Sequence, residues 1–419
     1  MSDAQSPLRI ALLAYRGKPH VGGQGVYIRH LSKALVDLGH HVEVLGGQPY
    51  PELDPRVPLV ELPSLDIYND HFPMRLPGPW EIKGLGDLVE VTNFMSGSFP
   101  EPLAFSVRAA QHLRRRTGEF DLVHDNQSLG YGLLAIEKMG LPVLGTIHHP
   151  ITVDRRLEME HARNVWTRFS KSRWYAFTKM QTRVASKLTR IITVSESSFG
   201  DITKDHDVDP ARLHVVPVGV DPELFRPLPH VQRVPGRLIT TASADVTMKG
   251  LRYLLEALAE LRKTRDVSLV VIGKPKPGGP SAHTIDELGL TEHVTFISGV
   301  PDQRIVELYA EAELAVVPSL YEGFSLPAIE AMASGVPLVA TTGGALPEVT
   351  GAAGETCFQV EPGNSVALAA EIARALDSPE ARDRIGAAGR DRVIERWSWR
   401  HTAEATVEQY RALLEEWPR

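Results

Sequence analysis

The sequence predicts an α/β protein made of two successive doubly wound halves, each with a parallel sheet between layers of helices. Short apolar runs of strand length alternate with stretches whose apolar residues recur at helical spacing, which is the pattern of βαβ units. A Gly- and Pro-rich stretch over 218–237 interrupts this rhythm, which then restarts. The 419 residues also exceed one ordinary core and fit two domains of roughly 200 residues each.

The first half opens with a βαβ unit. An apolar run over 9–15 predicts a buried strand, and a helix with one apolar face follows over 28–38. The glycine loop between them departs from the G-x-G-x-x-G dinucleotide fingerprint, because its third position is Ile28. We therefore expect the backbone near Gly22 and Gly23 to approach a sugar phosphate rather than NAD. A plain flexible turn between strand and helix is the alternative.

Polar residues follow two further predicted strands of this half. Asp125 and Asn126 end one strand, and His148 and His149 end the next. Because the carboxyl ends of parallel strands border the ligand crevice, we expect these side chains to meet a substrate. The alternatives are that Asp125 or Asn126 caps the following helix and that the histidines are structural. A metal at the two histidines would need further ligands, which the sequence does not place, so no metal site is expected.

The segment 155–190 is basic and rich in aromatic residues. Over 154–190, ten Lys or Arg residues stand against three acidic ones, and no Gly or Pro interrupts the stretch. Such a helical segment suits an anionic membrane surface or an anionic acceptor. A long solvated helix packed on the domain is the alternative.

Composition excludes several classes of protein. The net charge of −7 argues against nucleic-acid binding. The single cysteine, Cys357, excludes an intrachain disulfide and a cysteine zinc site. No apolar segment approaches the ~20 residues of a membrane span, and the N-terminus lacks a signal-peptide pattern. We expect a cytoplasmic protein, with contact at the inner face of the membrane as a further expectation from 155–190. The oligomeric state stays open.

The most informative stretch of the second half runs from residue 318 to 333. A buried strand is expected before it, Gly323 makes the turn, and a helix begins near Pro327. A helix N-terminus suits a phosphate, because its backbone N–H groups and its dipole both favour an anion. Glu322 precedes the helix and Glu330 lies inside it, where a carboxylate can accept hydrogen bonds from a ribose diol. The stretch therefore predicts a sugar-nucleotide site.

These residues resemble the donor-site signature of the family 4, or group 1, glycosyltransferases of the GT-B type, whose core is an E-x7-E pair. The resemblance spans nearly the whole chain, because other family motifs follow in the expected order. They are the glycine loop at 22–25, the strand ending at His148, the hinge at 215–221 and the pair Lys249-Gly250.

The resemblance implies two Rossmann-like domains that face a cleft. Residues 1–217 would bind the acceptor and 218–399 the nucleotide sugar, and a final helix over about 400–419 would pack back on the first domain. It further implies transfer of a hexosyl group from a nucleotide-diphosphate sugar to an acceptor hydroxyl, with retention of configuration and without a metal or other cofactor.

The resemblance also implies roles for single residues. Glu330 would bind the ribose, Glu322 the transferred sugar and Lys249 the diphosphate, while His148 would face the reacting centre. The remaining positions of the site would contact the donor, chiefly through backbone at Gly22, Gly23, Gly323, Phe324, Ser325 and Leu326, or the acceptor, at Asp125, Asn126 and His149.

One departure from the family concerns the diphosphate. The family usually has an arginine before the Lys-Gly pair, but this chain has Ser243-Ala244-Asp245, so Lys249 acts alone or with another cation such as Lys274. Two other functions stay open: a glycoside hydrolase that uses Glu322 and Glu330, and a non-catalytic nucleotide-sugar-binding protein. The donor's base and sugar are open, and the acceptor is either lipid or membrane-associated or a small soluble alcohol.

Overall fold

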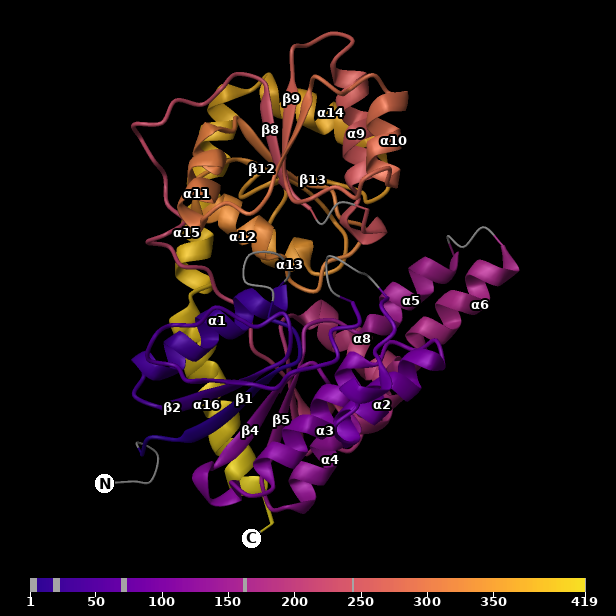
Figure 1. The fold of residues 1–419 in the computed structure, drawn as a ribbon. Helices are drawn as coiled ribbons and strands as arrows, with labels where there is room; N and C mark the ends of the chain where they lie inside the picture. Colours follow the sequence, from indigo (N-terminus) through magenta and orange to yellow (C-terminus); the bar gives the residue numbers. More distant parts are fainter. Residues whose placement is uncertain (1–5, 18–22, 69–73, 161–163, 243–244, 419) are drawn as a thin grey trace. The chain divides into compact units, whose positions relative to one another are not determined.

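The protein contains two parallel sheets with helices on their faces (Figure 1), as the sequence predicts. The computed structural model describes residues 6–17, 23–68, 74–160, 164–242 and 245–418, with the side chain of residue 157 left out. Contacts divide the chain into two compact units. Unit 1 contains Met1–Val194, Ser198–Val216 and Thr402–Arg419, and unit 2 contains Ser195–Ser197 and Pro217–His401.

The sheet of unit 1 has the order β3-β2-β1-β4-β5-β6-β7, and all its strand pairs are parallel. Its strands are β1 Arg9–Ala14, β2 His41–Gly46, β3 Leu59–Glu61, β4 Leu122–Asn126, β5 Val143–Ile147, β6 Arg190–Thr193 and β7 Leu213–Val215. The helices that follow them are α1 Gly23–Asp37, α2 Leu85–Met95, α3 Glu101–Leu113, α4 Tyr131–Lys138, α5 Ile151–Glu160, α6 Val165–Trp174, α7 Thr178–Ala185 and α8 Glu196–His206.

The sheet of unit 2 has the order β10-β9-β8-β11-β12-β13, again with parallel pairs. Its strands are β8 Arg237–Thr241, β9 Ser268–Ile272, β10 Val294–Ile297, β11 Leu314–Val317, β12 Leu338–Thr341 and β13 Phe358–Val360. The longer helices are α9 Leu251–Leu261, α10 Pro280–Glu287, α11 Asp302–Glu311, α12 Leu326–Ala333, α13 Leu346–Thr350, α14 Ser365–Leu376 and α15 Pro379–Arg396.

Each sheet reverses its strand order once, and these switch points decide where ligand loops gather. In unit 1 the reversal lies between β1 and β4, and in unit 2 between β8 and β11. Connections from the two strands at a switch point diverge, which leaves a crevice at their carboxyl ends. Asn126 is the last residue of the switch-point strand β4, and the loops that carry Lys249 and Glu322 follow the switch-point strands β8 and β11. His148 follows β5, the neighbour of β4.

The strands are buried on both faces, which explains why the sequence reads as continuous apolar runs. Every residue of β4, β5, β6, β11 and β12 is buried. The helices supply one apolar face each, such as Leu254, Leu255 and Leu258 on α9. The core of each unit therefore lies between its sheet and its helices.

Two segments differ from the sequence-based expectation. Residues 46–103 are more regular than predicted, because they contain β3 and α2, and α3 begins at Glu101 instead of near residue 104. The segment 154–190 is divided into α5, α6 and α7 instead of forming one helix. Asn164 starts α6 as an N-cap, since its side chain accepts a hydrogen bond from the Thr167 amide at 2.8 Å.

The last helix, α16 Trp399–Glu416, joins unit 1 from Thr402 onwards. In Figure 1 it is the yellow helix beside the indigo and purple strands. Arg190 on β6 donates to Gln409 at 2.6 Å and to Glu416 at 2.5 Å, and the side chains of Tyr410 and Leu413 are buried. None of the helices in the described parts of the chain is both long enough and apolar enough to cross a membrane.

Glu137 near the end of α4 predicts a pH-dependent stability. Its Oε1 is buried and finds no partner among the described residues, and burial raises the pKa of its carboxyl to about 7. As the pH rises from about 5 to 8, the unfolded chain releases this proton before the folded chain does, so the free energy of unfolding falls. Glu137→Gln removes this part of the fall, which urea unfolding across that pH range measures.

The matched control is Glu408→Gln, because Glu408 is exposed in the same unit. Equal pH profiles for wild type and Glu137→Gln would contradict the assignment.

Candidate active site

In unit 2 the loop after β11 holds a nearly buried ion pair. The side chain of Glu322 is 8% exposed, and its two carboxylate oxygens lie 2.9 and 3.0 Å from Lys249 Nζ. The Ser319 hydroxyl donates to the same carboxylate at 2.7 Å. Burying a carboxylate costs several kcal/mol unless a countercharge and hydrogen bonds replace water, and this site supplies both.

A glycine allows Lys249 to reach that loop. Gly250 has φ +65°, and a Cβ at this position would lie 1.9 Å from the carbonyl oxygen of Pro318. The Leu320 amide also donates to the carbonyl of Met248 at 2.7 Å. The Lys-Gly pair is therefore seated directly on the loop that carries Glu322, and a side chain at 250 would separate them.

The N-terminus of α12 follows Glu322 after Gly323, Phe324 and Ser325. Ser325 has φ +98°, and its buried hydroxyl has no partner within the described ranges. Leu326 begins the helix, and Pro327 occupies its first turn. Phe324 packs edge-on against Trp397 with 5.4 Å between ring centroids, and this contact anchors the loop. The predicted positions 322–326 thus form one turn that leads into a helix N-terminus, where an anion is favoured.

Glu330 lies within α12 in a different environment from Glu322. Its carboxyl is hydrogen-bonded to Tyr309, and the Tyr309 hydroxyl lies 3.1 Å from Thr241 Oγ1. Loss of water raises the pKa of Glu330 to about 7, and the charge of Asp302 adds to this shift. The two glutamates of the E-x7-E pair therefore have separate partners, unlike the acid and nucleophile of a glycosidase, which face one bond.

The segment Ser243-Ala244-Asp245, which replaces the family's arginine-containing motif, carries a carboxylate at its last position. Asp245 has φ +67°, and its side chain accepts hydrogen bonds from the amides of Lys276 at 3.1 Å and Ser281 at 2.8 Å. It therefore closes the loop after β9 instead of offering positive charge. Lys274 is exposed in this loop. Ser243 and Ala244 lie outside the described residues.

In unit 1, His148 follows β5 and is held on three sides. Its Nε2 lies 2.7 Å from Asn126 Oδ1, its amide donates to Gln127 Oε1 at 2.8 Å, and its ring packs edge-on against Tyr27 at 4.7 Å. Burial lowers the pKa of His148 to about 3, and the neighbouring His149 contributes to this shift. The imidazole is therefore neutral at neutral pH.

The hydrogen bonds of Asn126 decide which nitrogen of His148 carries the proton. Asn126 Nδ2 donates to the carbonyl of Gln24 at 3.3 Å, so its Oδ1 is the atom that faces His148. An oxygen can only accept, and His148 Nε2 must then be the protonated nitrogen. Its Nδ1 keeps a lone pair and is an acceptor.

Sequence reasoning missed Gln127, which clamps both histidines. Its Oε1 accepts from the His148 amide and its Nε2 donates to the His149 carbonyl, each at 2.8 Å. Gln181 on α7 donates to the carbonyl of Ser128 at 3.2 Å and supports the same turn. The only signal in the sequence was a glutamine directly after a predicted strand, which alone does not identify its partners.

The other predicted residues of unit 1 lie in contrasting positions. Asp125 is buried and its carboxylate is used inside the turn, where it accepts from the Ser128 hydroxyl and the Leu129 amide. His149 Nε2 lies 3.1 Å from Asp154 Oδ2. Gly23 is the exposed first residue of α1, whereas Gly22 lies outside the described residues.

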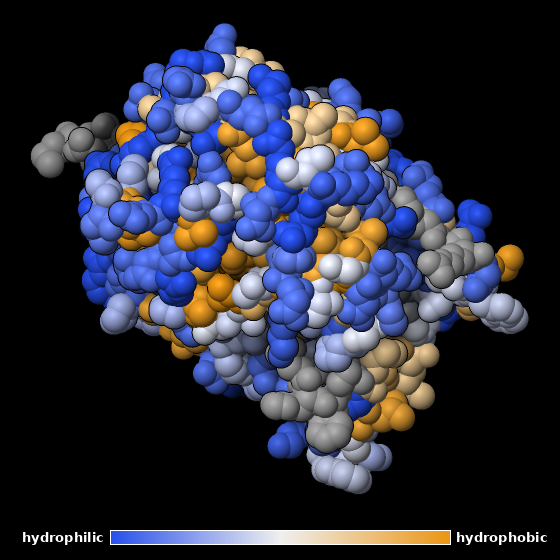
Figure 2. All heavy atoms as spheres, turned by 90° about the horizontal axis from the view of Figure 1, so that it is seen from above, coloured by the Kyte–Doolittle hydropathy of each residue, from blue (hydrophilic) through white to orange (hydrophobic). Residues whose placement is uncertain are grey.

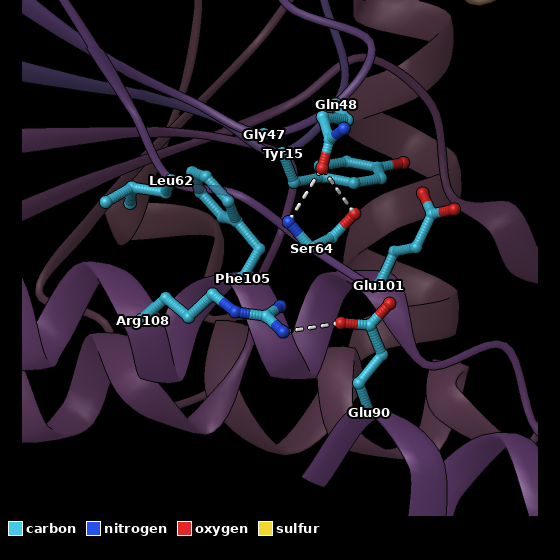
Figure 3. A pocket seen from close by; sticks show the side chains of 9 residues that line it. All are labelled: Tyr15, Gly47, Gln48, Leu62, Ser64, Glu90, Glu101, Phe105 and Arg108. Atoms are coloured by element: carbon cyan, nitrogen blue, oxygen red, sulfur yellow. Dashed lines mark hydrogen bonds and ion pairs between the residues drawn. The ribbon is translucent and has the colours of Figure 1, made fainter. Parts of the chain in front are cut away.

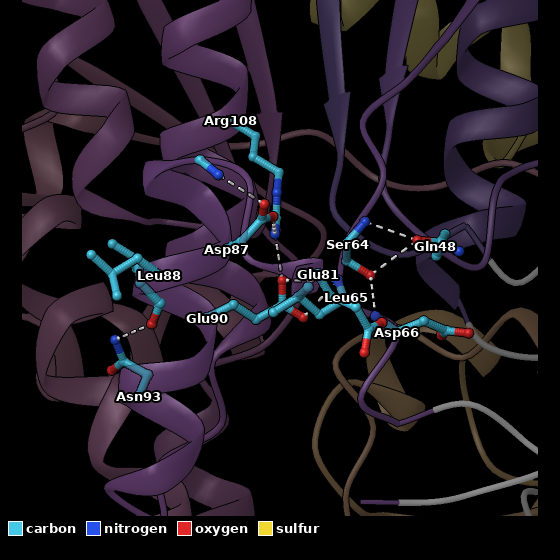
Figure 4. Close-up of polar contacts among 12 residues, drawn as sticks. Gln48, Ser64, Leu65, Asp66, Glu81, Asp87, Leu88, Glu90, Asn93 and Arg108 are labelled. Carbon is cyan, nitrogen blue, oxygen red and sulfur yellow. Dashed lines mark hydrogen bonds and ion pairs between the residues drawn. The ribbon is translucent and has the colours of Figure 1, made fainter. Parts of the chain in front are cut away.

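A small polar pocket lies at the ends of β1 and β2 (Figure 3), lined by Tyr15, Gly47, Gln48, Leu62, Ser64, Glu90, Glu101, Phe105 and Arg108. Its free volume of about 10 Å³ holds roughly one water, so a sugar ring does not fit. Arg108 donates at 2.6 Å to both Asp87 and Glu90, and Glu90 accepts from the amide of Leu65 (Figure 4). These contacts tie α2 and α3 to the loop after β3.

Within the described ranges, no three His, Cys, Asp or Glu side chains gather as ligands of a metal ion would. The ligand-contacting residues expected from sequence thus fall into two groups, one in each unit. Lys249, Glu322 and the turn 323–326 are adjacent in unit 2, and Asn126, His148 and His149 are adjacent in unit 1.

Known proteins with similar sequences and folds identify the family of this chain. The sequence profile of Glycosyltransferase Family 4 matches residues 21–224, and that of Glycosyl transferases group 1 matches residues 230–392. The MMP alpha-(1->4)-mannosyltransferase of Mycolicibacterium hassiacum is 52% identical over 404 residues, which cover 96% of this chain and 98% of the relative.

Two solved structures share the fold. Sucrose-phosphate synthase from Thermosynechococcus elongatus has a TM-score of 0.73 at 23% identity and covers 97% of this chain and 99% of its own. Anabaena HepE in complex with UDP-glucose has a TM-score of 0.70 at 18% identity and covers 97% of this chain and 100% of its own. The chain therefore belongs to glycosyltransferase family 4, the group 1 glycosyl transferases, and is a glycosyltransferase with the GT-B fold.

Proposed function

We propose that the protein is a retaining α-mannosyltransferase that moves a mannosyl group from a nucleotide-diphosphate mannose to the 4-hydroxyl of an acceptor sugar. The sugar and linkage are those in the name of the relative that is 52% identical to this chain. The observation that carries the proposal is the Lys249–Glu322 pair beside the N-terminus of α12, which supplies a cation, a dipole and a hydroxyl acceptor together.

The donor half of the mechanism uses these groups in turn. The Lys249 ammonium has three protons, and contacts to the two Glu322 oxygens leave one for a phosphate oxygen. Lys249 and the backbone N–H groups of 323–326 stabilise the departing diphosphate without a metal. Glu322 accepts from hydroxyls of the transferred sugar, and Glu330 accepts from the ribose.

The acceptor half of the mechanism is proposed to lie in unit 1. His148 faces the transferred sugar, and its unprotonated Nδ1 accepts a hydrogen bond from a hydroxyl of that sugar. Asn126 and His149 contact the acceptor, and Asp125 supports their turn. A neutral imidazole adds no positive charge near the anomeric carbon, where an oxocarbenium-like charge develops. The acceptor oxygen attacks the face from which diphosphate leaves, the bond from C1 to the phosphate oxygen breaks, and a phosphate oxygen takes the hydroxyl proton.

The two alternative functions find less support. A hydrolase would need Glu322 as a free nucleophile or acid, but this carboxylate is paired with Lys249. A non-catalytic binding protein would not need the clamp that Gln127 makes around His148 and His149.

The proposal is tested with purified protein, a panel of nucleotide-diphosphate hexoses and a methyl α-mannoside acceptor. We expect thermal stabilisation by one mannose donor, of about 2.7 kcal/mol at 100 times its Kd. We also expect a product whose new anomeric centre is α by NMR and a rate unchanged by EDTA. A β-linked product, or release of free mannose alone with acceptor present, would contradict retaining transfer.

Lys249→Ala should slow the transfer. Loss of one charged contact to the leaving group costs about 1.5–3 kcal/mol, so kcat/KM should fall roughly 10- to 150-fold. Lys249→Arg keeps the charge and should recover part of the rate. Lys263→Ala is the control, because Lys263 lies after α9 and pairs with Glu260 on the surface. Wild-type kcat/KM in Lys249→Ala would remove this residue from leaving-group stabilisation.

We further propose that unit 1 contacts an anionic membrane through 155–190. Among the described residues fourteen large hydrophobic side chains are exposed, and nine of them lie in two segments of unit 1, at 74–95 and 165–169. Trp166 on α6 is 82% exposed and Phe169 is 59% exposed. The face shown in Figure 2 is mainly hydrophilic, with hydrophobic areas among the polar ones. An open groove of about 580 Å³ beside them is lined by Arg155, Arg156 and Arg168 together with Thr152, Met159, Glu160 and Asp205.

Aromatic side chains flanked by arginines favour the interface of an anionic bilayer. We expect the protein to sediment with phosphatidylglycerol vesicles at low salt and much less with phosphatidylcholine vesicles. Trp166→Ser with Phe169→Ser should abolish this binding. Val366→Ser on α14 is the control, because Val366 is 75% exposed but lies in unit 2. Equal binding by the double variant, or none by wild type, would contradict the proposal.

A further inference from the structure

A set of buried side chains, linked by hydrogen bonds and closed into a ring by the backbone of α16, lies next to His148 in unit 1. Tyr410 on α16 lies 2.7 Å from His124 Nδ1 on β4, and His124 Nε2 lies 2.5 Å from Thr146 Oγ1 on β5. The hydroxyl of Tyr27 on α1 is hydrogen-bonded to Thr146 and to Thr406. Thr406 lies on α16, the helix that also carries Tyr410. Each of these five side chains is at most 1% exposed, so water does not substitute for any partner.

The carbonyl of Thr402 determines which group donates and which accepts in each hydrogen bond of the ring. The Thr406 hydroxyl donates to the carbonyl of Thr402 at 2.6 Å, so it must accept from Tyr27. Tyr27 then accepts from Thr146, and Thr146 accepts from the Nε2–H of His124. His124 Nδ1 is left to accept from Tyr410. Every hydroxyl donates once, and His124 is neutral with its proton on Nε2.

Burial supports that state, because it lowers the pKa of His124 to about 3. The neighbouring His148 is the titratable group that faces the ring, and it lowers the pKa of His124 further. Burial raises the pKa of both tyrosines.

The ring reaches His148 through one side chain. The Tyr27 ring stands edge-on to the His148 imidazole, with 4.7 Å between centroids and 81° between planes. The strands make a second link, because Thr146 and His148 are two residues apart, as are His124 and Asn126. Asn126 Oδ1 holds His148 Nε2 on the other side. The imidazole is thus held between Asn126 and a tyrosine that the ring keeps in place.

We propose that Tyr27, Thr146, His124 and Tyr410 are positioning residues through which the C-terminal helix α16 sets the orientation of the His148 imidazole. The inference rests on the proposed function, in which His148 faces the transferred sugar. In addition to packing on the sheet of unit 1, α16 then helps to hold the His148 imidazole through Tyr410 and Thr406. Misplacement of a reacting or orienting group by about 1 Å can cost on the order of 100-fold in rate.

If the ring only stabilised the fold, its variants would behave differently. A buried polar ring that loses one hydroxyl leaves its neighbour unsatisfied and weakens the fold whether or not it orients His148. Stability by itself therefore does not separate the two roles. The orientation and tautomer of His148, and the division of the effect between kcat and KM, do separate them.

The experiment uses the full chain with Tyr410→Phe, Thr146→Val and Thr146→Ser. Long-range ¹H–¹⁵N spectra of wild type should show His124 and His148 as neutral Nε2–H tautomers. We expect Tyr410→Phe and Thr146→Val to shift the His148 ring signals and to lower kcat at least about tenfold, with the donor KM changed less than about twofold. Thr146→Ser keeps the hydroxyl and should restore the signals and kcat.

Gln409→Leu is the matched control on the same helix. Gln409 accepts from Arg190 at 2.6 Å and makes no bond to the ring, so this change loosens α16 elsewhere. We expect the urea midpoint to fall while the His148 signals and kcat stay at wild-type values. Unshifted His148 signals in both Tyr410→Phe and Thr146→Val, or an equal fall of kcat in Gln409→Leu, would overturn the proposal.

His148→Ala keeps this inference distinct from the proposed function. A fully active His148→Ala variant would refute the role of His148 in transfer, whatever the ring does. The spectra do not depend on turnover, so they still decide whether Tyr410 and Thr146 orient the imidazole. Shifted His148 signals with unchanged kcat would refute the catalytic consequence and leave the donor site of unit 2 untouched.

Discussion

A carboxylate that is almost fully buried needs a countercharge, and the pair of Glu322 with Lys249 meets this need in unit 2. Local features of the neighbouring backbone accompany this pair. Gly250 must be a glycine, since the backbone passes within contact distance of Pro318, and Asp245 shapes the adjoining loop. The turn into α12 then presents its backbone N–H groups next to the only basic side chain that contacts Glu322 in the described structure. An anion site and a hydroxyl acceptor thus arise from one electrostatic requirement.

The buried polar side chains around His148 in unit 1 are accommodated in a different way. His124 and His148 are kept neutral by loss of water, and hydrogen bonds with fixed direction assign their protons. Gln127 and Asn126 hold the backbone and ring of His148, while the ring of Tyr27, Thr146, His124, Tyr410 and Thr406 lies behind it. Uncharged polar groups suit a region near developing positive charge, whereas the ion pair of unit 2 suits a departing anion. In the mechanism that we propose, the neutral groups of unit 1 face the developing positive charge and the ion pair of unit 2 faces the departing anion.

Both sites depend on the same topological feature. Asn126 ends a strand at the switch point of one sheet, and the loops after the switch-point strands of the other sheet carry Lys249 and Glu322. The rest of each sheet and its helices fix the direction in which these loops leave. The family supplies this scaffold, while substrate identity depends on side chains that vary upon it.

The sequence by itself determined the two α/β halves, the glutamate pair, the Lys-Gly pair and the histidines at a strand end. These features follow from local periodicity and from motifs whose residues are close in the chain. Only the tertiary structure decided that Lys249 contacts Glu322, that Asp125 serves its own turn, and that Gln127 clamps two histidines. It also divided 151–185 into separate helices and joined Tyr410 to His124, which are 286 residues apart. Hydrogen-bond partners between distant elements depend on how those elements pack, and no local pattern encodes that.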